Sequence, residues 1–356
     1  MKNLRKILKI MVGLVALLLA APAFAQSDKP IPVVATFSIL GDMVKRIGGA
    51  HVSVSTLVGP DGDTHVYQPT PADTRAVSKA KLLFVNGLDF EGWIDRLVKA
   101  SGFNGMRVVT TRGINAIAFE DRHDDHGKDE HHKDEHGQEA HHKDERHKDE
   151  HGHEKKHAGA DRHKDHADDK HGDEHAEHNH GAFDPHGWQS LKNAVIYVDN
   201  ITGALAKADP ANAATFYGNH AAYVAEIEAL DAEIRRIVTG LPSGRRTVVT
   251  SHDAFQYFGR DYGLKFLAPQ GLSTDSEASA KDVAKLIKQM REQGISAVFV
   301  ENITDKRLLE QIANETGATI GGTLYPGALS GSDGPASTYL DMIRHNATTL
   351  TQSLGS

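Results

Sequence analysis

Short apolar runs rich in β-branched residues alternate with amphipathic stretches along most of this 356-residue chain, and the alternation occurs twice. The first set of apolar runs comprises PVVATF (32–37), HVSVSTLVG (51–59), KLLFVNGL (81–88) and MRVVTT (106–111). The second set comprises TVVTS (247–251), LKFLAP (264–269), AVFVEN (297–302) and ATIGGTLY (318–325). Strands that alternate with helices favour parallel sheets covered by helices on both faces. We therefore predict an α/β fold that is built twice.

One long helical pattern separates the two sets. Its apolar face recurs at intervals of four and three residues, at Phe216, His220, Tyr223, Ile227, Leu230, Ile234 and Ile237. A helix over 210–240 would span roughly 40 Å, which is long for a single domain. We therefore predict an N-terminal lobe at 26–210, a linking helix at 211–240 and a C-terminal lobe at 241–356. An ordinary core helix of one larger domain is the alternative.

The first 25 residues have the pattern of a secretory signal peptide. A basic start (Lys2, Arg5, Lys6) precedes the apolar run 10–21, and the small-residue sequence 23–25 predicts cleavage near Ala25. An uncleaved signal anchor is the alternative. The sequence contains no cysteine, which excludes disulfides, thiolate metal sites and a lipid-bearing Cys. We expect an exported, periplasmic protein.

A second unusual segment, 121–181, holds 17 of the 23 histidines, mixed with Asp, Glu, Lys and Gly and without a large apolar residue. Such a segment cannot offset its ordering entropy by burial, so we predict a disordered insert. Clustered imidazoles indicate labile metal capture, whereas a charged linker is the alternative reading. The candidate metal-binding histidines of the insert are His123, His126, His131, His132, His136, His141, His142, His147, His151, His153, His157, His163, His166, His171, His175, His178 and His180.

Charge outside the insert is balanced. The formal net charge of −8 arises within the insert, which has 20 acidic and 11 basic residues, and 28 acidic and 29 basic residues remain elsewhere. No basic stripe indicates nucleic-acid binding.

Three histidines outside the insert occupy binding-prone positions. His65 lies in a turn-rich loop after a predicted strand, His186 directly follows the insert, and His252 ends a predicted strand. Ligands bind at the carboxyl ends of strands in open α/β sheets, and three imidazoles suit zinc. Taken singly, each could instead be a capping or core residue. We interpret His51, His220 and His345 as structural or surface residues.

Four segments resemble the zinc/manganese solute-binding proteins of ABC importers, the cluster A-I family of ZnuA, AztC and TroA types. These segments are GPDGDTHVYQPTPADTRAVSKAKLLFVNGLDFEGWIDRL, DPHGW, TVVTSHDAFQYFGRDYGLKFLAPQGLSTDSEAS and GPASTYLDMIRHN. The resemblance implies two small α/β lobes with four-stranded sheets, joined by one long helix, with the metal in the cleft between them. It implies that His65, His186 and His252 are the metal ligands, and the His-rich insert points to the zinc branch.

The fourth ligand is less defined. Many members of the family have an Asp in a turn after the last strand, where this chain has Gly327, and Thr64 lacks the carboxylate that some relatives use. Water, Asp333 or a histidine from the insert could complete the site. Glu301 and Asp275 lie near predicted strand ends, but the resemblance does not support them as ligands.

The resemblance implies a periplasmic zinc receptor, monomeric, that delivers Zn²⁺ to an inner-membrane ABC permease with its ATPase. The resemblance leaves open whether a periplasmic zinc chaperone is a further partner. The insert would capture zinc as an auxiliary segment. Two alternatives are a periplasmic zinc storage or chaperone protein and a three-histidine zinc enzyme, because three His with an open position can also activate water.

Overall fold

The computed structural model describes residues 29–118 and 182–355. The predicted signal peptide and the His-rich insert lie outside these residues. Within them, no helix is long and apolar enough to cross a membrane.

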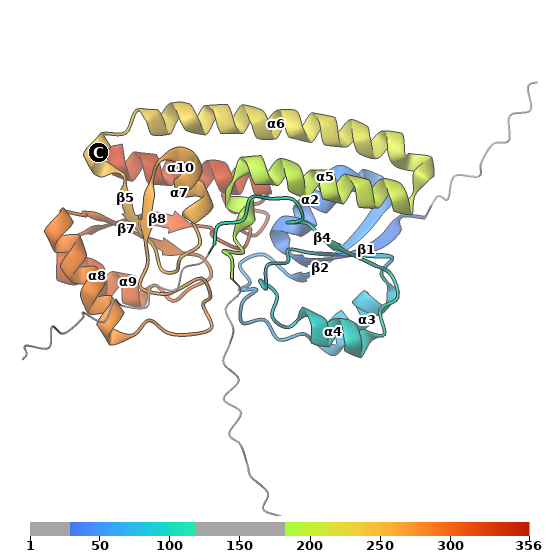
Figure 1. The fold of residues 1–356 in the computed structure, drawn as a ribbon, viewed down its shortest axis with the longest axis horizontal. Coiled ribbons are helices and arrows are strands. Elements are labelled where there is room, and N and C mark those ends of the chain that lie inside the picture. Colours follow the sequence, from blue (N-terminus) through green and yellow to red (C-terminus); the bar gives the residue numbers. More distant parts are fainter. Residues whose placement is uncertain (1–28, 119–181, 356) are drawn as a thin grey trace, which may run out of the picture. The chain divides into compact units, whose positions relative to one another are not determined.

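Two parallel four-stranded sheets confirm the predicted fold class (Figure 1). The first sheet has the order β2-β1-β3-β4 and the second the order β6-β5-β7-β8. The strands of the first sheet are β1 (Ile31–Phe37), β2 (Val52–Val58), β3 (Leu82–Val85) and β4 (Met106–Val109). The strands of the second are β5 (Thr247–Val249), β6 (Lys265–Leu267), β7 (Ala297–Glu301) and β8 (Thr319–Leu324). We call the two sheets with their helices the first and second lobes.

Helices cover both faces of each sheet, as the alternation requires (Figure 1). In the first lobe these helices are α2 (Ser38–Gly48) and α5 (Leu191–Ala208) on one face, and α3 (Pro71–Lys79) and α4 (Ile94–Ser101) on the other. In the second lobe they are α7 (Gln256–Tyr262) and α10 (Tyr339–Gly355) on one face, and α8 (Ala280–Gln293) and α9 (Arg307–Thr316) on the other.

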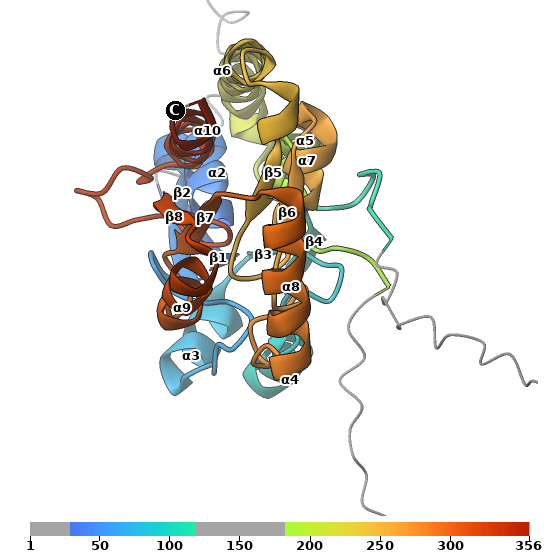
Figure 2. The same cartoon turned by 90° about the vertical axis from the view of Figure 1, so that its left-hand side faces the viewer.

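The long helix α6 (Ala213–Thr239) connects the lobes and packs along α5 and α10 (Figures 1 and 2). It begins later than the predicted 211, because Pro210–Asn212 form a separate 3-10 turn. Phe216, Tyr223 and Ile227 are among its buried residues, as the spacing predicts. The lobe boundaries at 26–210 and 241–356 remain predictions.

The lobes share one hydrophobic core. Phe37 of the first sheet, Trp188 just before α5 and Phe255 of the second lobe belong to the same cluster of buried residues. A smaller cluster lies between the second sheet and helices α8 and α9. The connection between the lobes is therefore a packed interface as well as a helix.

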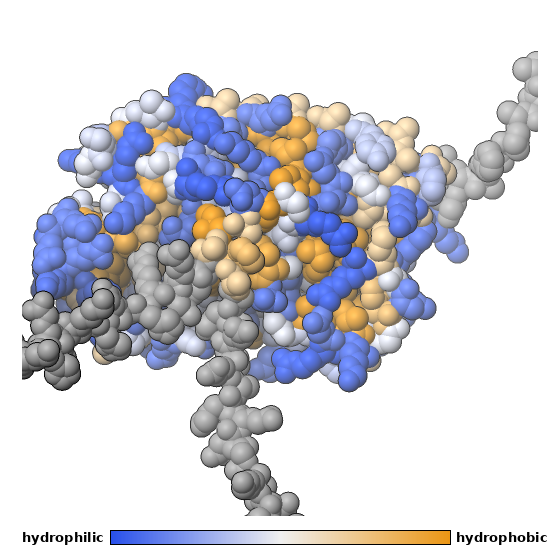
Figure 3. Space-filling model, in the orientation of Figure 1, coloured by the Kyte–Doolittle hydropathy of each residue, from blue (hydrophilic) through white to orange (hydrophobic). Residues whose placement is uncertain are grey.

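The exposed surface mixes hydrophilic and hydrophobic residues (Figure 3). Four large hydrophobic residues are exposed in the described part of the chain, and they lie far apart in the sequence: Val66, Phe183, Tyr217 and Ile320. Such scattered residues are ordinary for a protein surface.

Candidate metal centre

His65 lies in the loop that follows β2, and both polar groups of the peptide unit that precedes it are hydrogen-bonded. The Asp63 carboxylate accepts the His65 N–H at 2.9 Å, and the Trp93 indole donates to the Thr64 carbonyl at 2.9 Å. The second oxygen of Asp63 accepts from the Thr274 hydroxyl of the second lobe at 2.5 Å. The His65 loop is thus held by both lobes.

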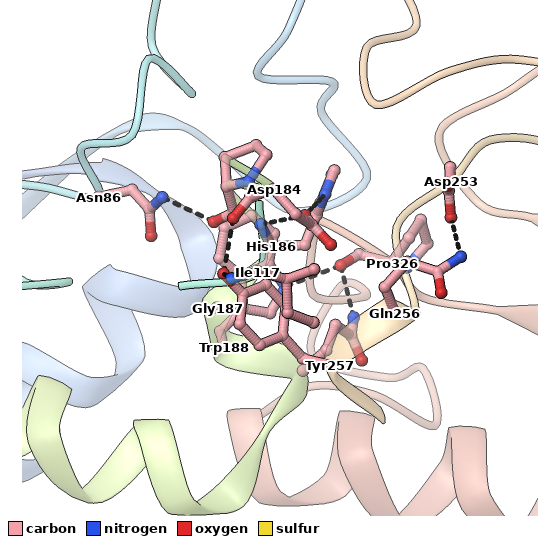
Figure 4. A network of polar contacts seen from close by, with 12 residues as sticks. Asn86, Ile117, Asp184, His186, Gly187, Trp188, Asp253, Gln256, Tyr257 and Pro326 are labelled. Atoms are coloured by element: carbon pink, nitrogen blue, oxygen red, sulfur yellow. Dashed lines mark hydrogen bonds and ion pairs between the residues drawn. The ribbon is translucent and has the colours of Figure 1, made fainter. Parts of the chain in front are cut away.

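His186 lies in a short segment between residue 182 and α5, shown in Figure 4. Oδ1 of Asp184 accepts the His186 backbone N–H at 2.9 Å and lies 2.8 Å from its Nδ1. Asn86 Nδ2 donates to the Pro185 carbonyl at 2.9 Å, which fixes the turn from the first sheet. With Nδ1 directed at a carboxylate, Nε2 is the nitrogen left for a metal.

His252 follows β5, and Glu301 is the last residue of the neighbouring strand β7. Because parallel neighbours end at the same sheet edge, the two side chains meet. Nδ1 of His252 lies 2.6 Å from Oε2 of Glu301, while Oε1 accepts the backbone N–H of Ser251 at 3.1 Å and of His252 at 3.2 Å. Both oxygens of the Glu301 carboxylate contact the His252 segment, so the carboxylate orients His252, and it is not among the clustered ligand atoms.

The three predicted histidines come together. Their ligand atoms all lie within 4.8 Å of one another, and they form the only such group of His, Cys, Asp or Glu in the described part of the chain. The Nε2 atoms of His65 and His186 are 3.4 Å apart. Two nitrogens on one tetrahedral zinc, each at about 2.05 Å, would be separated by about 3.3 Å. The spacing therefore suits a shared zinc ion.

One nitrogen of the group is buried without a hydrogen-bond partner: Nε2 of His252. Buried polar atoms in native proteins are nearly always paired, so this atom indicates a ligand. His186 and His252 are both 0% exposed, and Phe90 packs edge-on against His65 with the ring centroids 4.9 Å apart. Two of the three imidazoles are therefore fully buried, and His65 is partly exposed.

Burial and the neighbouring charges set different pKa directions in the site. Burial lowers the pKa of His186 well below its usual value, so its imidazole is neutral. Burial also lowers the pKa of His252, but the Glu301 carboxylate outweighs it and the net pKa is raised. Burial raises the pKa of Asp184 to about 7. A proton therefore competes with a metal at His252 at a higher pH than at an ordinary histidine.

Among the described residues, the other candidate metal ligands do not lie in the group of His65, His186 and His252. Asp333 lies in an exposed loop, where the nearby Ser332 hydroxyl is 3.4 Å from its carboxylate. His220 pairs with Asp199, and Nε2 of His345 lies 3.0 Å from the Thr323 carbonyl. The seventeen insert histidines lie outside the described residues.

Sequence reasoning missed the roles of Asp184 and Glu301. Asp184 had a local signal, because a carboxylate two residues before a histidine can reach both its backbone and its ring. Glu301 had none, because its contact with His252 depends on the adjacency of β5 and β7.

Comparison with known proteins identifies the family of the chain. The family described as "ZnuA: Zinc-uptake complex component A periplasmic" matches residues 33–353. The chain is 29% identical to "Iron-binding protein YfeA" of Yersinia pestis, over 95% of this chain and 92% of the relative. It is 30% identical to "Manganese-binding lipoprotein MntA" of Bacillus subtilis, over 92% of this chain and 91% of the relative.

A solved structure has the same fold. The periplasmic zinc binding protein TroA from Treponema pallidum aligns with a TM-score of 0.72 and 26% identity, covering 92% of this chain and 99% of its own. Together, the family match, the two-lobe fold and these relatives show that the chain belongs to the ZnuA family of periplasmic metal-binding receptors for ABC importers.

Proposed function

We propose that the protein binds Zn²⁺ through His65, His186 and His252 and delivers it to an inner-membrane ABC permease with its ATPase. The observation that carries the proposal is the triad itself, in which three imidazoles have ligand atoms within 4.8 Å and Nε2 of His252 is buried and unpartnered. Zinc is the cargo, and no chemistry is performed on it.

The donor set supports zinc over manganese, the metal named for one of the two curated relatives. Imidazole nitrogen suits Zn²⁺, whereas Mn²⁺ prefers carboxylate, carbonyl and water oxygens. The two carboxylates that face the histidines, Asp184 and Glu301, are each directed at an Nδ1 atom. They therefore increase the basicity of the ligands and do not replace them.

Water is the fourth ligand in this proposal. Asp333 is exposed and outside the histidine group, and Gly327 has no side chain. A neutral water at the fourth position leaves imidazoles as the main determinants of selectivity.

The remaining parts of the proposal rest on the sequence. The signal-like pattern of the first 25 residues supports a periplasmic protein. The 356 residues contain no Cys that could carry the lipid of a lipoprotein. The insert histidines would capture zinc weakly before transfer to the cleft. The protein would act as a monomer and could receive zinc from a periplasmic chaperone.

The enzyme alternative is less well supported. A zinc hydrolase needs a carboxylate or another base beside the metal-bound water. Asp184 and Glu301 already hold the Nδ1 atoms of His186 and His252. A zinc storage protein would use the same site, but it would have no permease as a partner.

Metal competition tests the proposal. Calorimetry on the full chain should give one tight Zn²⁺ site with much weaker binding of Mn²⁺ and Fe²⁺. His252→Ala should weaken this site by at least about 100-fold, because it removes one of three protein ligands. The control His345→Ala should retain it, since His345 is not in the triad. Tighter Mn²⁺ than Zn²⁺ binding, or equal effects of the two variants, would overturn the assignment. Uptake into vesicles that carry a reconstituted permease would separate delivery from storage.

A further inference from the structure

One hydroxyl of the second lobe bonds to two segments of the first. The Tyr257 hydroxyl, on α7, donates to the Asp184 carbonyl at 2.7 Å and accepts the Ile117 backbone N–H at 3.1 Å (Figure 4). Asp184 and Ile117 are far apart in the sequence and lie on either side of residues 119–181. Tyr257 therefore joins the second lobe to both of these segments at one point.

The two segments are also paired with each other. The Asp184 N–H donates to the Ile117 carbonyl at 2.9 Å, and Ala118 and Phe183 form an antiparallel bridge. Arg260, one turn further along α7, lies over the Tyr257 ring at 5.1 Å and donates to the Asn115 carbonyl at 3.3 Å. Tyr257 therefore contacts both paired segments through its hydroxyl and Arg260 through its ring, and it is 0% exposed. We call this pairing of the two segments the junction.

Asp184 connects this junction to the metal centre. Its carbonyl is held by Tyr257, and its carboxylate holds both the backbone and the Nδ1 of His186. The other carboxylate oxygen, Oδ2, is buried without a partner. The position of this carboxylate therefore depends on the backbone that Tyr257 fixes.

The hydroxyl is a permanent donor. Burial raises the pKa of Tyr257 to about 12, so the group stays protonated across the physiological range.

We propose that Tyr257 is a positioning residue for zinc: its hydroxyl fixes the Asp184 backbone and thereby the carboxylate that orients the His186 imidazole. The inference rests on the proposed function, because it matters only if His186 ligates the metal. It means that a side chain of the second lobe controls the geometry of a ligand that belongs with the first lobe.

Tyr257→Phe tests this inference with little change of shape, because it keeps the ring and removes the hydroxyl. Tyr262→Phe is a matched control on the same helix, since the Tyr262 hydroxyl donates to Asp231 at 2.7 Å on α6. Tyr257→Phe should release Zn²⁺ about 10-fold faster, the lower end of the effect of losing a direct partner of a metal ligand, because Tyr257 acts on His186 through Asp184. The visible spectrum of bound Co²⁺ should shift as well, whereas Tyr262→Phe should match the wild type in both. Equal release rates and Co²⁺ spectra in both variants would overturn the inference, whatever their melting temperatures.

A double-mutant cycle with Asp184→Asn tests the route. If Tyr257 acts through Asp184, the double variant should lose little more zinc affinity than Asp184→Asn alone, so the two effects would not add. Full additivity would overturn the route through Asp184. A wild type without tight zinc would instead contradict the proposed function, which keeps the two failures distinct.

Discussion

Nδ1 of His252 lies 2.6 Å from the Glu301 carboxylate, and both side chains are fully buried. This contact leaves Nε2 as the nitrogen that faces the other two histidines, and it increases the basicity of the ring as a ligand. The same carboxylate also accepts the backbone N–H groups of Ser251 and His252. One residue therefore sets both the orientation of the ring and the path of the loop that carries it.

Glu301→Gln should weaken zinc binding by about 10- to 100-fold. The amide would keep the size of the side chain, but its NH₂ group would face an N–H group that now donates a hydrogen bond to Glu301. Zinc affinity measured by competition with a chelator checks this outcome. Glu292→Gln, at an exposed position of helix α8, is the control and should leave the affinity unchanged. A wild-type affinity for Glu301→Gln would remove the role assigned to the carboxylate.

Zinc affinity should decrease as the pH falls through the range in which the His252 imidazole takes up a proton. The pKa of His252 is raised, because Glu301 outweighs the burial that would lower it, so a proton competes for this imidazole at a higher pH than for an isolated histidine. His186 remains neutral, since burial lowers its pKa, and it adds no such competition. Calorimetry in buffers of different ionisation enthalpy should therefore show more proton release on zinc binding at pH 6 than at pH 8. Proton release that grows with increasing pH would contradict the sign.

Deletion of residues 122–180 should leave one tight zinc per chain and remove the weaker sites. The triad histidines all lie outside the deleted segment, which contains all seventeen histidines of the insert. Metal analysis and calorimetry on the two proteins give the numbers of tight and weak sites. Loss of tight binding would mean that the insert supplies a primary ligand.

The doubled α/β architecture could be predicted from the sequence because the spacing of apolar residues is a local property. The long helix followed from the same periodicity, although its start at Ala213 reflects the 3-10 turn at Pro210–Asn212. The three histidines were selected by their positions in the predicted fold, but only the resemblance implied that they act together, since residues so far apart share no local motif. The contact of Glu301 with His252, and that of Tyr257 with Asp184, could not be predicted. Both depend on which strands and lobes become neighbours, and periodicity does not specify that.

Gly327→Asp should tighten zinc binding by about 10-fold if water completes the site, because an anionic oxygen would replace a neutral ligand near a divalent ion. The position has space: a Cβ there would meet Ile303 at 3.7 Å and Trp188 at 3.9 Å, which are ordinary contacts. Mn²⁺ affinity should rise as well, since a carboxylate is a harder ligand than imidazole.

Asp333→Ala, measured beside it, should change zinc affinity less than about twofold, because Asp333 is exposed and outside the histidine group. The two substitutions separate two accounts of the fourth ligand. If Asp333→Ala costs as much affinity as the loss of a histidine and Gly327→Asp gains nothing, the loop after β8 supplies its carboxylate from a new position. If only Gly327→Asp changes the affinity, the chain has no carboxylate ligand in this loop, and its zinc preference comes from the three imidazoles.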